Sequence, residues 1–319
     1  MNVLFVTNGY PTQNSPNLCP FIHSQVLDLK AIGLNVEVIS VSQFQKFGYF
    51  KTFIRSLFLI KNYNVVHFHH GLTLLLCFSF CFLYPKKKFV ISFLNNIEVE
   101  YEELNSKFLQ SFLVKLTKLV IKITNITVIE KNSRFSRNFK SYYVLPNGVD
   151  LDFYVRKDKS LARAKLRLAD NDFVFLFISS KTLYRNQKRI DRFHEIISSN
   201  PQITPLYMSG VDKIETIDYY SAADFLVITS ELEGSPNAVK ESIACGTPVL
   251  SLDVGDVKNI LNGEENSKVF NSFDEMKNYV KDNNVNLLKR KFFDGHKLII
   301  KNGYDSHDIA SQLRVIYTN

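Results

Sequence analysis

Two glutamates, Glu233 and Glu241, stand eight positions apart in the stretch SELEGSPNAVKESIACGTPVLSLDVGD, residues 230–256. Carboxylates accept hydrogen bonds from hydroxyl groups, so two of them can hold ribose and sugar hydroxyls on either side of a diphosphate. A capped surface helix with two solvated glutamates would show the same spacing. The spacing of the two glutamates favours a site that binds a nucleotide sugar.

The residues between the two glutamates predict a helix from about Pro236 to Cys245. Ser235 is a favourable N-cap, proline is favoured at the first helical position, and Gly246 supplies a stop. The first turn, from Asn237 onward, presents backbone N–H groups without intrahelical partners. Together with the helix dipole, these groups can bind a phosphate.

The flanks of this helix extend the motif. YYSAADFLVITS (219–230) precedes it and CGTPVLSLDVGD (245–256) follows it. The whole segment resembles the E-x7-E region of retaining glycosyltransferases of the GT-B fold, family four, also called glycosyl transferases group 1. The resemblance implies that Glu241 holds the ribose and that Glu233 contacts the donor sugar. It also implies that the diphosphate lies against the backbone of four residues: Ser235, Pro236, Asn237 and Ala238.

Strands and helices alternate along the whole chain, beginning with the apolar run 2–7, a helix over 21–32 and a second run at 36–41. This alternation predicts parallel, doubly wound α/β sheets. A length of 319 residues suits two domains better than one. The pattern breaks at VLPNGVD (144–150), which resembles the interdomain signature of the same family.

The fold class expected is therefore α/β, GT-B, with two Rossmann-like domains whose parallel sheets face across a cleft. We expect an N-terminal, acceptor-side domain over residues 1–145 and a C-terminal, nucleotide-sugar-binding domain over 146–319. The last helix can pack back on the first domain.

A donor diphosphate carries negative charge, and members of the family usually bind it with basic residues early in the second domain. Lys188, in the sequence KRID, resembles the family's lysine, and Lys181 stands near the place of its arginine. The catalytic candidates are therefore Glu233, Lys188 and Lys181. In the first domain, Gly9 matches the family's glycine-rich loop, whereas Leu94 stands where the family often has a histidine.

The bulk composition excludes several classes of function. The net charge of +8 and a pI near 9.1 suggest an anionic partner, but no nucleic-acid-binding motif is present. His67, His69 and His70 lack an acidic or cysteine partner at ligand spacing, so we expect no metal. The resemblance implies no cofactor beyond the donor itself. Four scattered cysteines fit a reducing cytoplasm.

Two segments are typical of a membrane surface. Residues 49–62 mix aromatic and basic side chains, and Lys86, Lys87 and Lys88 follow the apolar run 72–84. That run has 13 residues, fewer than the roughly 20 that a membrane span needs. A buried helix with a solvated lysine tip explains the second segment equally well. We expect a cytoplasmic protein in peripheral contact with the inner face of the cell membrane.

Taken together, the resemblance implies a retaining, hexosyltransferase-type glycosyltransferase that moves a sugar from a nucleoside diphosphate donor to a glycan or a lipid-linked glycan. Its expected setting is bacterial surface polysaccharide biosynthesis, as in capsule or exopolysaccharide assembly. Two alternatives stay open. One is a non-catalytic GT-B partner subunit that binds a nucleotide sugar, and the other is a nucleotide-sugar epimerase of the same fold.

Overall fold

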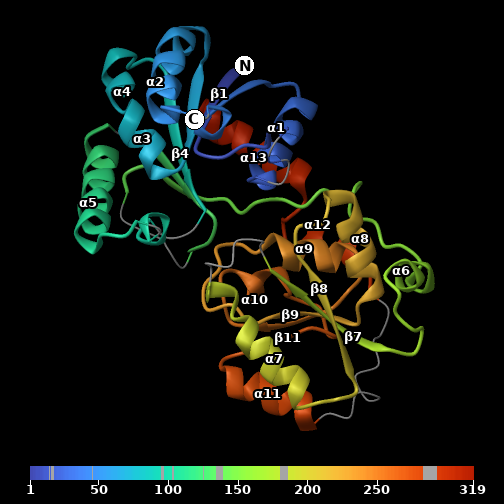
Figure 1. Ribbon diagram of the computed structural model, residues 1–319. Helices are drawn as coiled ribbons and strands as arrows, with labels where there is room; N and C mark the ends of the chain where they lie inside the picture. The colour runs from blue at the N-terminus through green and yellow to red at the C-terminus, as the bar shows by residue number, and fades with distance from the viewer. Residues whose placement is uncertain are drawn as a thin grey trace. The chain divides into compact units, whose positions relative to one another are not determined.

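The computed structural model describes the chain except residues 14, 16–17, 45, 95–96, 103, 125, 134–138, 180–185 and 283–292. It divides into two compact units (Figure 1). The first unit consists of Met1–Gly148 together with Ser306–Asn319, and the second is Val149–Asp305. The final helix therefore belongs to the first unit, although its residues follow the second in sequence.

In the described part of the first unit, six parallel strands form one sheet in the order β2-β1-β3-β4-β5-β6. Each strand is a short apolar run, as expected for strands that are covered on both faces. The strands are β1 (Asn2–Thr7), β2 (Asn35–Ser40), β3 (Val65–His69), β4 (Lys88–Phe93), β5 (Thr127–Glu130) and β6 (Tyr142–Val144).

Two helical layers cover this sheet. Alternate side chains of β1 point to opposite faces, so Val3 and Phe5 lie in one core cluster while Leu4 and Val6 lie in another. The first cluster is covered by α1 (Pro20–Ala31) and α13 (Ser306–Thr318). The second is covered by α2 (Gly48–Leu59), α3 (Gly71–Cys77), α4 (Ser79–Leu83) and α5 (Lys107–Thr124).

The second unit contains a parallel sheet with the strand order β11-β10-β9-β7-β8. Its strands are β7 (Phe173–Ile178), β8 (Ile203–Met208), β9 (Phe225–Ile228), β10 (Val249–Leu252) and β11 (Lys268–Phe270). Its helices are α6 (Lys159–Lys165), α7 (Ile190–Ser198), α8 (Lys213–Ala222), α9 (Asn237–Ala244), α10 (Val257–Ile260), α11 (Phe273–Asp282) and α12 (Gly295–Lys301).

The winding of the second sheet reverses between β7 and β9. The chain passes from β7 to its neighbour β8 on one side, and then returns to place β9 on the other side of β7. In open parallel sheets the loops that leave the carboxyl ends of two such strands diverge, and ligands bind in the crevice between them. The segments that follow β7 and β9 are therefore where a ligand is expected.

One glycine fixes the position of α9 in this unit. Helix α12 lies beside α9 (Figure 1) and begins at Gly295, after the N-cap Asp294. A Cβ atom at Gly295 would lie 1.8 Å from the carbonyl oxygen of Ile243 in α9. Because that obstacle is backbone, it cannot rotate away, and any larger residue must separate the two helices.

We expect Gly295→Ala to lower the free energy of unfolding by about 1–3 kcal/mol, the usual cost of overpacking. Urea unfolding of the purified variant measures this change. Lys297→Ala, on the exposed side of the same helix, is the matched control and should change stability by less than about 0.5 kcal/mol. Equal stability of the two variants would contradict the close contact between α9 and α12.

Candidate functional site

The segments that follow β7 and β9 are fixed to one another by hydrogen bonds to backbone. The hydroxyl of Thr229 donates to the carbonyl oxygens of Lys188 at 2.9 Å and Arg189 at 3.0 Å. The backbone N–H of Glu231 donates to the carbonyl of Gln187 at 2.8 Å. Lys188 therefore has a defined position at the switch point, where the winding of the second sheet reverses between β7 and β9. Residues 180–185 before it are outside the described part.

Two predicted site residues, Lys188 and Glu233, meet here. The ammonium Nζ of Lys188 lies 2.6 Å from Oε1 of Glu233, and the hydroxyl of Ser230 donates to the same oxygen at 2.7 Å. The lysine side chain is 33% exposed and the glutamate 15%. A partly exposed pair of this kind contributes about 0–1 kcal/mol, so a bound phosphate can attract the ammonium at little cost.

Helix α9 begins one residue later than the sequence predicted. Pro236 is its N-cap, Asn237 is its first residue, and no side chain caps it. The prediction that Ser235 caps the helix is wrong because the hydroxyl of Ser235 donates instead to Asp256, at 2.8 Å. The buried amide oxygen of Asn237 has no hydrogen-bond partner. The helix start thus presents polar groups that a ligand could satisfy.

A buried polar network supports this helix start from below. Lys240, with no exposed surface, donates from Nζ to the Ser235 hydroxyl at 2.9 Å. The Ser235 hydroxyl and the Tyr304 hydroxyl, at 3.0 Å, both donate to the same oxygen of Asp256. Burial lowers the pKa of Lys240 to about 8 and raises the pKa of Asp256. The spacing of these residues in the sequence does not predict this network.

A second glycine brings the loop after β10 against the loop after β9. Gly255 has a φ of +55°, and a Cβ atom there would lie 2.4 Å from the carbonyl oxygen of Gly234. Only glycine adopts this conformation at such a close approach without strain. Gly255 thereby places Asp256 within reach of Ser235, which stands two residues after the predicted sugar-binding residue Glu233.

Glu241 is held by two tyrosines that sequence reasoning did not identify. The hydroxyl of Tyr220, from α8, donates to its Oε2 at 2.7 Å, and the hydroxyl of Tyr154 also bonds to the carboxylate. Burial raises the pKa of Glu241, while these two hydrogen bonds act in the opposite direction. The two tyrosine rings meet edge to face, with centroids 6.3 Å apart. The carboxylate of this partly exposed residue is therefore fixed in orientation.

The remaining predicted residues are placed as follows. Pro236 is buried and Ala238 partly buried at the start of α9, whereas Lys181 lies outside the described residues. Gly9 is buried in the first unit, in the segment after β1, where a Cβ atom would lie 2.6 Å from Sγ of Cys19.

Three histidines that follow one another closely in the first unit, His67, His69 and His70, serve packing and hydrogen bonding. His67 is buried within hydrogen-bond distance of the Tyr317 hydroxyl, at 2.6 Å, and the Ser92 hydroxyl, at 2.7 Å. Its ring stacks on His69, and His70 accepts from the N–H of Leu72 in α3. Within the described residues, no three histidine, cysteine or acidic side chains form a group that could hold a metal ion.

Residues 160–282, which include Lys188, Glu233 and Glu241, match the family model described as Glycosyl transferases group 1. No curated protein matches the chain. The family match therefore covers the greater part of the second unit and does not extend into the first.

Solved structures match over the whole chain. Sucrose-phosphate synthase (tll1590) from Thermosynechococcus elongatus is 15% identical with a TM-score of 0.70, covering 100% of this chain and 98% of that one. Anabaena Alr3699/HepE in complex with UDP is 14% identical with a TM-score of 0.69, covering 100% of both. The catalytic domain of Arabidopsis thaliana starch synthase IV, bound to ADP and acarbose, is 12% identical with a TM-score of 0.70, covering 100% and 99%.

At these identities the likeness concerns the fold. Together with the two parallel sheets, it confirms the predicted fold class, GT-B with two Rossmann-like α/β domains.

The buried network allows a double-mutant test. Lys240→Met leaves the Asp256 carboxylate without its nearby cation, and Asp256→Asn leaves the Lys240 ammonium without its anion, so each should destabilise by about 3 kcal/mol. The double variant removes both charges. Its loss of unfolding free energy should be smaller, by at least about 1 kcal/mol, than the sum of the losses in the two single variants. Additive changes in the urea unfolding free energies would show that the two groups do not interact.

The same lysine predicts a pH dependence. Its pKa is about 8 in the folded chain, against an ordinary value of 10.5. Between these values the unfolded chain binds more protons, so the free energy of unfolding should rise with pH. Across pH 8 to 10.5, the wild-type chain should therefore gain stability relative to Lys240→Met, measured by urea unfolding. A constant difference would mean that Lys240 titrates normally.

Proposed function

We propose that this chain is a glycosyltransferase that moves a sugar from a nucleoside diphosphate to a hydroxyl group of an acceptor. The observation that carries the proposal is the Lys188–Glu233 ion pair, which lies at the switch point of the second sheet, close in sequence to a helix start that no side chain caps. The match of residues 160–282 to the glycosyl transferases group 1 model supports it. So do solved structures of the same fold that hold UDP, UDP-glucose or ADP.

In this proposal the diphosphate lies at the start of α9, against the backbone of Ser235, Asn237 and Ala238. The helix dipole and the unpaired N–H groups of the first turn favour the negative charge there. Lys188 exchanges its weak pairing with Glu233 for the phosphate, which frees the glutamate oxygen for a hydroxyl of the donor sugar. Glu241, oriented by Tyr154 and Tyr220, accepts hydrogen bonds from the ribose.

The positive groups at this site act on the leaving diphosphate. As the bond between the anomeric carbon and the phosphate oxygen breaks, its electron pair stays on the diphosphate, and groups already aimed at that charge lower the barrier. Lys188 and Lys181 would supply this charge from the chain itself, and we propose that no metal cofactor is needed. For a retaining course, the acceptor oxygen bonds the same face of the anomeric carbon, and its proton passes to the departing phosphate.

The finer assignment follows the family resemblance. We propose a retaining transfer of a hexose to a glycan or a lipid-linked glycan during bacterial surface polysaccharide biosynthesis, at the cytoplasmic face of the membrane. No helix among the described residues is both long enough and apolar enough to cross a bilayer.

Calorimetric titration with UDP, GDP, ADP and dTDP tests the nucleotide site. At least one should bind, and Glu241→Ala should weaken it by about 10-fold to 100-fold, through loss of charge-assisted hydrogen bonds worth about 1.5–3 kcal/mol. Glu241→Gln keeps an acceptor for the two tyrosines, so it separates lost charge from a disturbed fold. The matched control is Glu195→Ala, an exposed partner of Lys277. Unchanged affinity in both Glu241 variants would overturn the ribose assignment.

Lys188→Ala should chiefly lower kcat, by about 100-fold, because it removes one group that stabilises the leaving charge. Release of the nucleoside diphosphate from the matching nucleotide sugar measures this change, with Lys277→Ala as the control lysine. Wild-type turnover in Lys188→Ala would contradict its catalytic role. Donor binding without any turnover in the wild-type chain would instead favour the non-catalytic partner subunit.

A further inference from the structure

Four helices form one layer over the first unit's sheet. Helix α3 contacts both α2 and α5, and the rings of Phe53 in α2 and Phe80 in α4 stack with centroids 5.4 Å apart. We call these helices the α2–α5 layer (Figure 1). Its inner side covers the core cluster that contains Leu4 and Val6.

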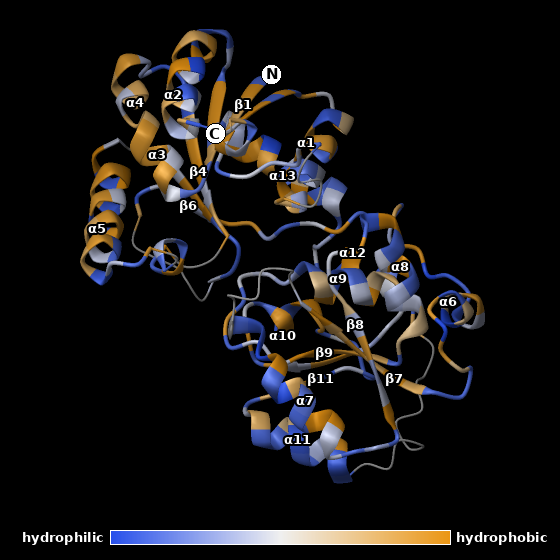
Figure 2. Ribbon diagram, in the orientation of Figure 1, coloured by the Kyte–Doolittle hydropathy of each residue, from blue (hydrophilic) through white to orange (hydrophobic). Residues whose placement is uncertain are grey.

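Helix α5 is apolar on two opposite sides. Its inner side buries Val114, Val120 and Ile121. Its outer side carries exposed residues whose spacing places them on one helical face, and the helix is coloured largely as hydrophobic in Figure 2. They are Phe108 (83% exposed), Phe112 (51%), Leu119 (53%) and Ile123 (52%). The inner side explains the folding of α5, whereas nothing in the fold explains the outer one.

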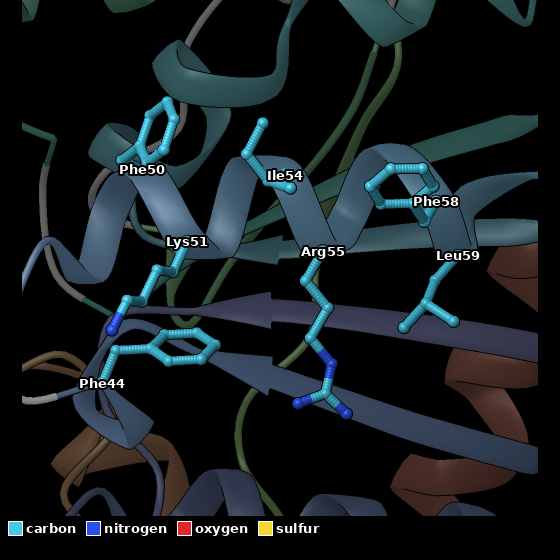
Figure 3. A pocket seen from close by; sticks show the side chains of 7 residues that line it. All are labelled: Phe44, Phe50, Lys51, Ile54, Arg55, Phe58 and Leu59. Atoms are coloured by element: carbon cyan, nitrogen blue, oxygen red, sulfur yellow. The ribbon is translucent and has the colours of Figure 1, made fainter.

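Helices α2 and α4 of the same layer also expose apolar side chains. Phe47 and Phe58, at the two ends of α2, are 77% and 68% exposed, and Leu83 of α4 is 64% exposed. Figure 3 shows Phe50, Ile54 and Phe58 along one side of α2, with Lys51 and Arg55 along the other. These residues line a hollow of about 450 Å³ together with Phe44 and Leu59. Exposed apolar surface on this scale marks an interaction site.

The charge of the layer is of one sign. Residues 38–97 contain seven lysines and arginines and no aspartate or glutamate, and residues 104–129 contain four lysines and again no acidic residue. The residues between these two ranges, 98–103, carry four glutamates, so the continuous stretch 38–129 has a net charge of +7. Lys107, Lys115 and Lys122 are exposed beside the outer face of α5. Of the acidic side chains beside the layer, Glu98 pairs with Lys118 and Glu37 pairs with Arg55.

This charge decides between the candidate partners. A second copy of the chain would bring two basic faces together, and lysine is depleted at protein–protein interfaces. Exposed phenylalanine and leucine among lysines and arginines instead suit the boundary of a bilayer that contains anionic lipid.

We propose that the α2–α5 layer binds the surface of an anionic phospholipid bilayer. The phenylalanines would enter the boundary between headgroups and acyl chains, while the lysines and arginines lie at the lipid phosphates. The proposal concerns the first unit and does not depend on the transferase activity.

Flotation of the full chain with vesicles tests this surface. The chain should bind vesicles of phosphatidylcholine with 30% phosphatidylglycerol, and binding to phosphatidylcholine alone should be at least about 100-fold weaker, since each basic residue contributes about 1 kcal/mol on an anionic surface. Phe108→Ser with Phe112→Ser should weaken binding at least about 10-fold. Leu161→Ser with Ile214→Ser, at exposed positions of the second unit, is the matched control.

A charge variant completes the test. Lys107→Gln, Lys115→Gln and Lys122→Gln together should weaken binding to the anionic vesicles about 100-fold, and 0.5 M salt should have a similar effect on the wild-type chain. The circular dichroism spectrum and the urea unfolding transition of each variant check that the chain remains folded. Vesicle binding that is absent, or equal in the Phe and control variants, would overturn the proposal. So would a dimer in sedimentation that only the Phe variants dissociate.

Discussion

The reversal of winding between β7 and β9 is the constraint on which the site depends. Because β8 and β9 lie on opposite sides of β7, the segments that leave β7 and β9 diverge. Hydrogen bonds from the Thr229 hydroxyl and the N–H of Glu231 hold the two segments together. This places a lysine from one segment against a glutamate from the other. For this reason we assign the proposed nucleotide site to these segments rather than to another part of the sheet.

The buried network under α9 shows what this arrangement costs. A lysine without exposed surface, a serine hydroxyl, a tyrosine hydroxyl and one carboxylate oxygen are hydrogen-bonded beneath the backbone that we assign to the diphosphate, while the other oxygen of Asp256 has no hydrogen-bond partner. Burial shifts the pKa of Lys240 down and that of Asp256 up, because it disfavours the charged form of each group. Keeping both groups charged inside the unit therefore lowers its stability. In return, the hydroxyl of Ser235 is fixed from two directions, and the start of α9 has little freedom to move.

The sequence was sufficient for the fold and for part of the site. Apolar runs predicted buried parallel strands, and the meeting of Lys188 with Glu233 involves residues already singled out by resemblance. It was insufficient for the partners of Ser235 and Glu241, because Asp256, Tyr304, Tyr154 and Tyr220 reach them through tertiary packing that local spacing does not encode. The outer face of α5 was missed for a related reason: an apolar helix with two hydrophobic sides is indistinguishable, in sequence, from a helix that is buried on both.

The most direct test of the central claim, that a nucleoside diphosphate lies at the start of α9, is amide hydrogen exchange measured by mass spectrometry with and without the diphosphate that binds. We expect amide hydrogen exchange to slow in peptides covering residues 229–241, and around Lys188, because the N–H groups there donate hydrogen bonds to the ligand. Protection confined to the first unit, or unchanged exchange across residues 229–241 at saturating ligand, would contradict it.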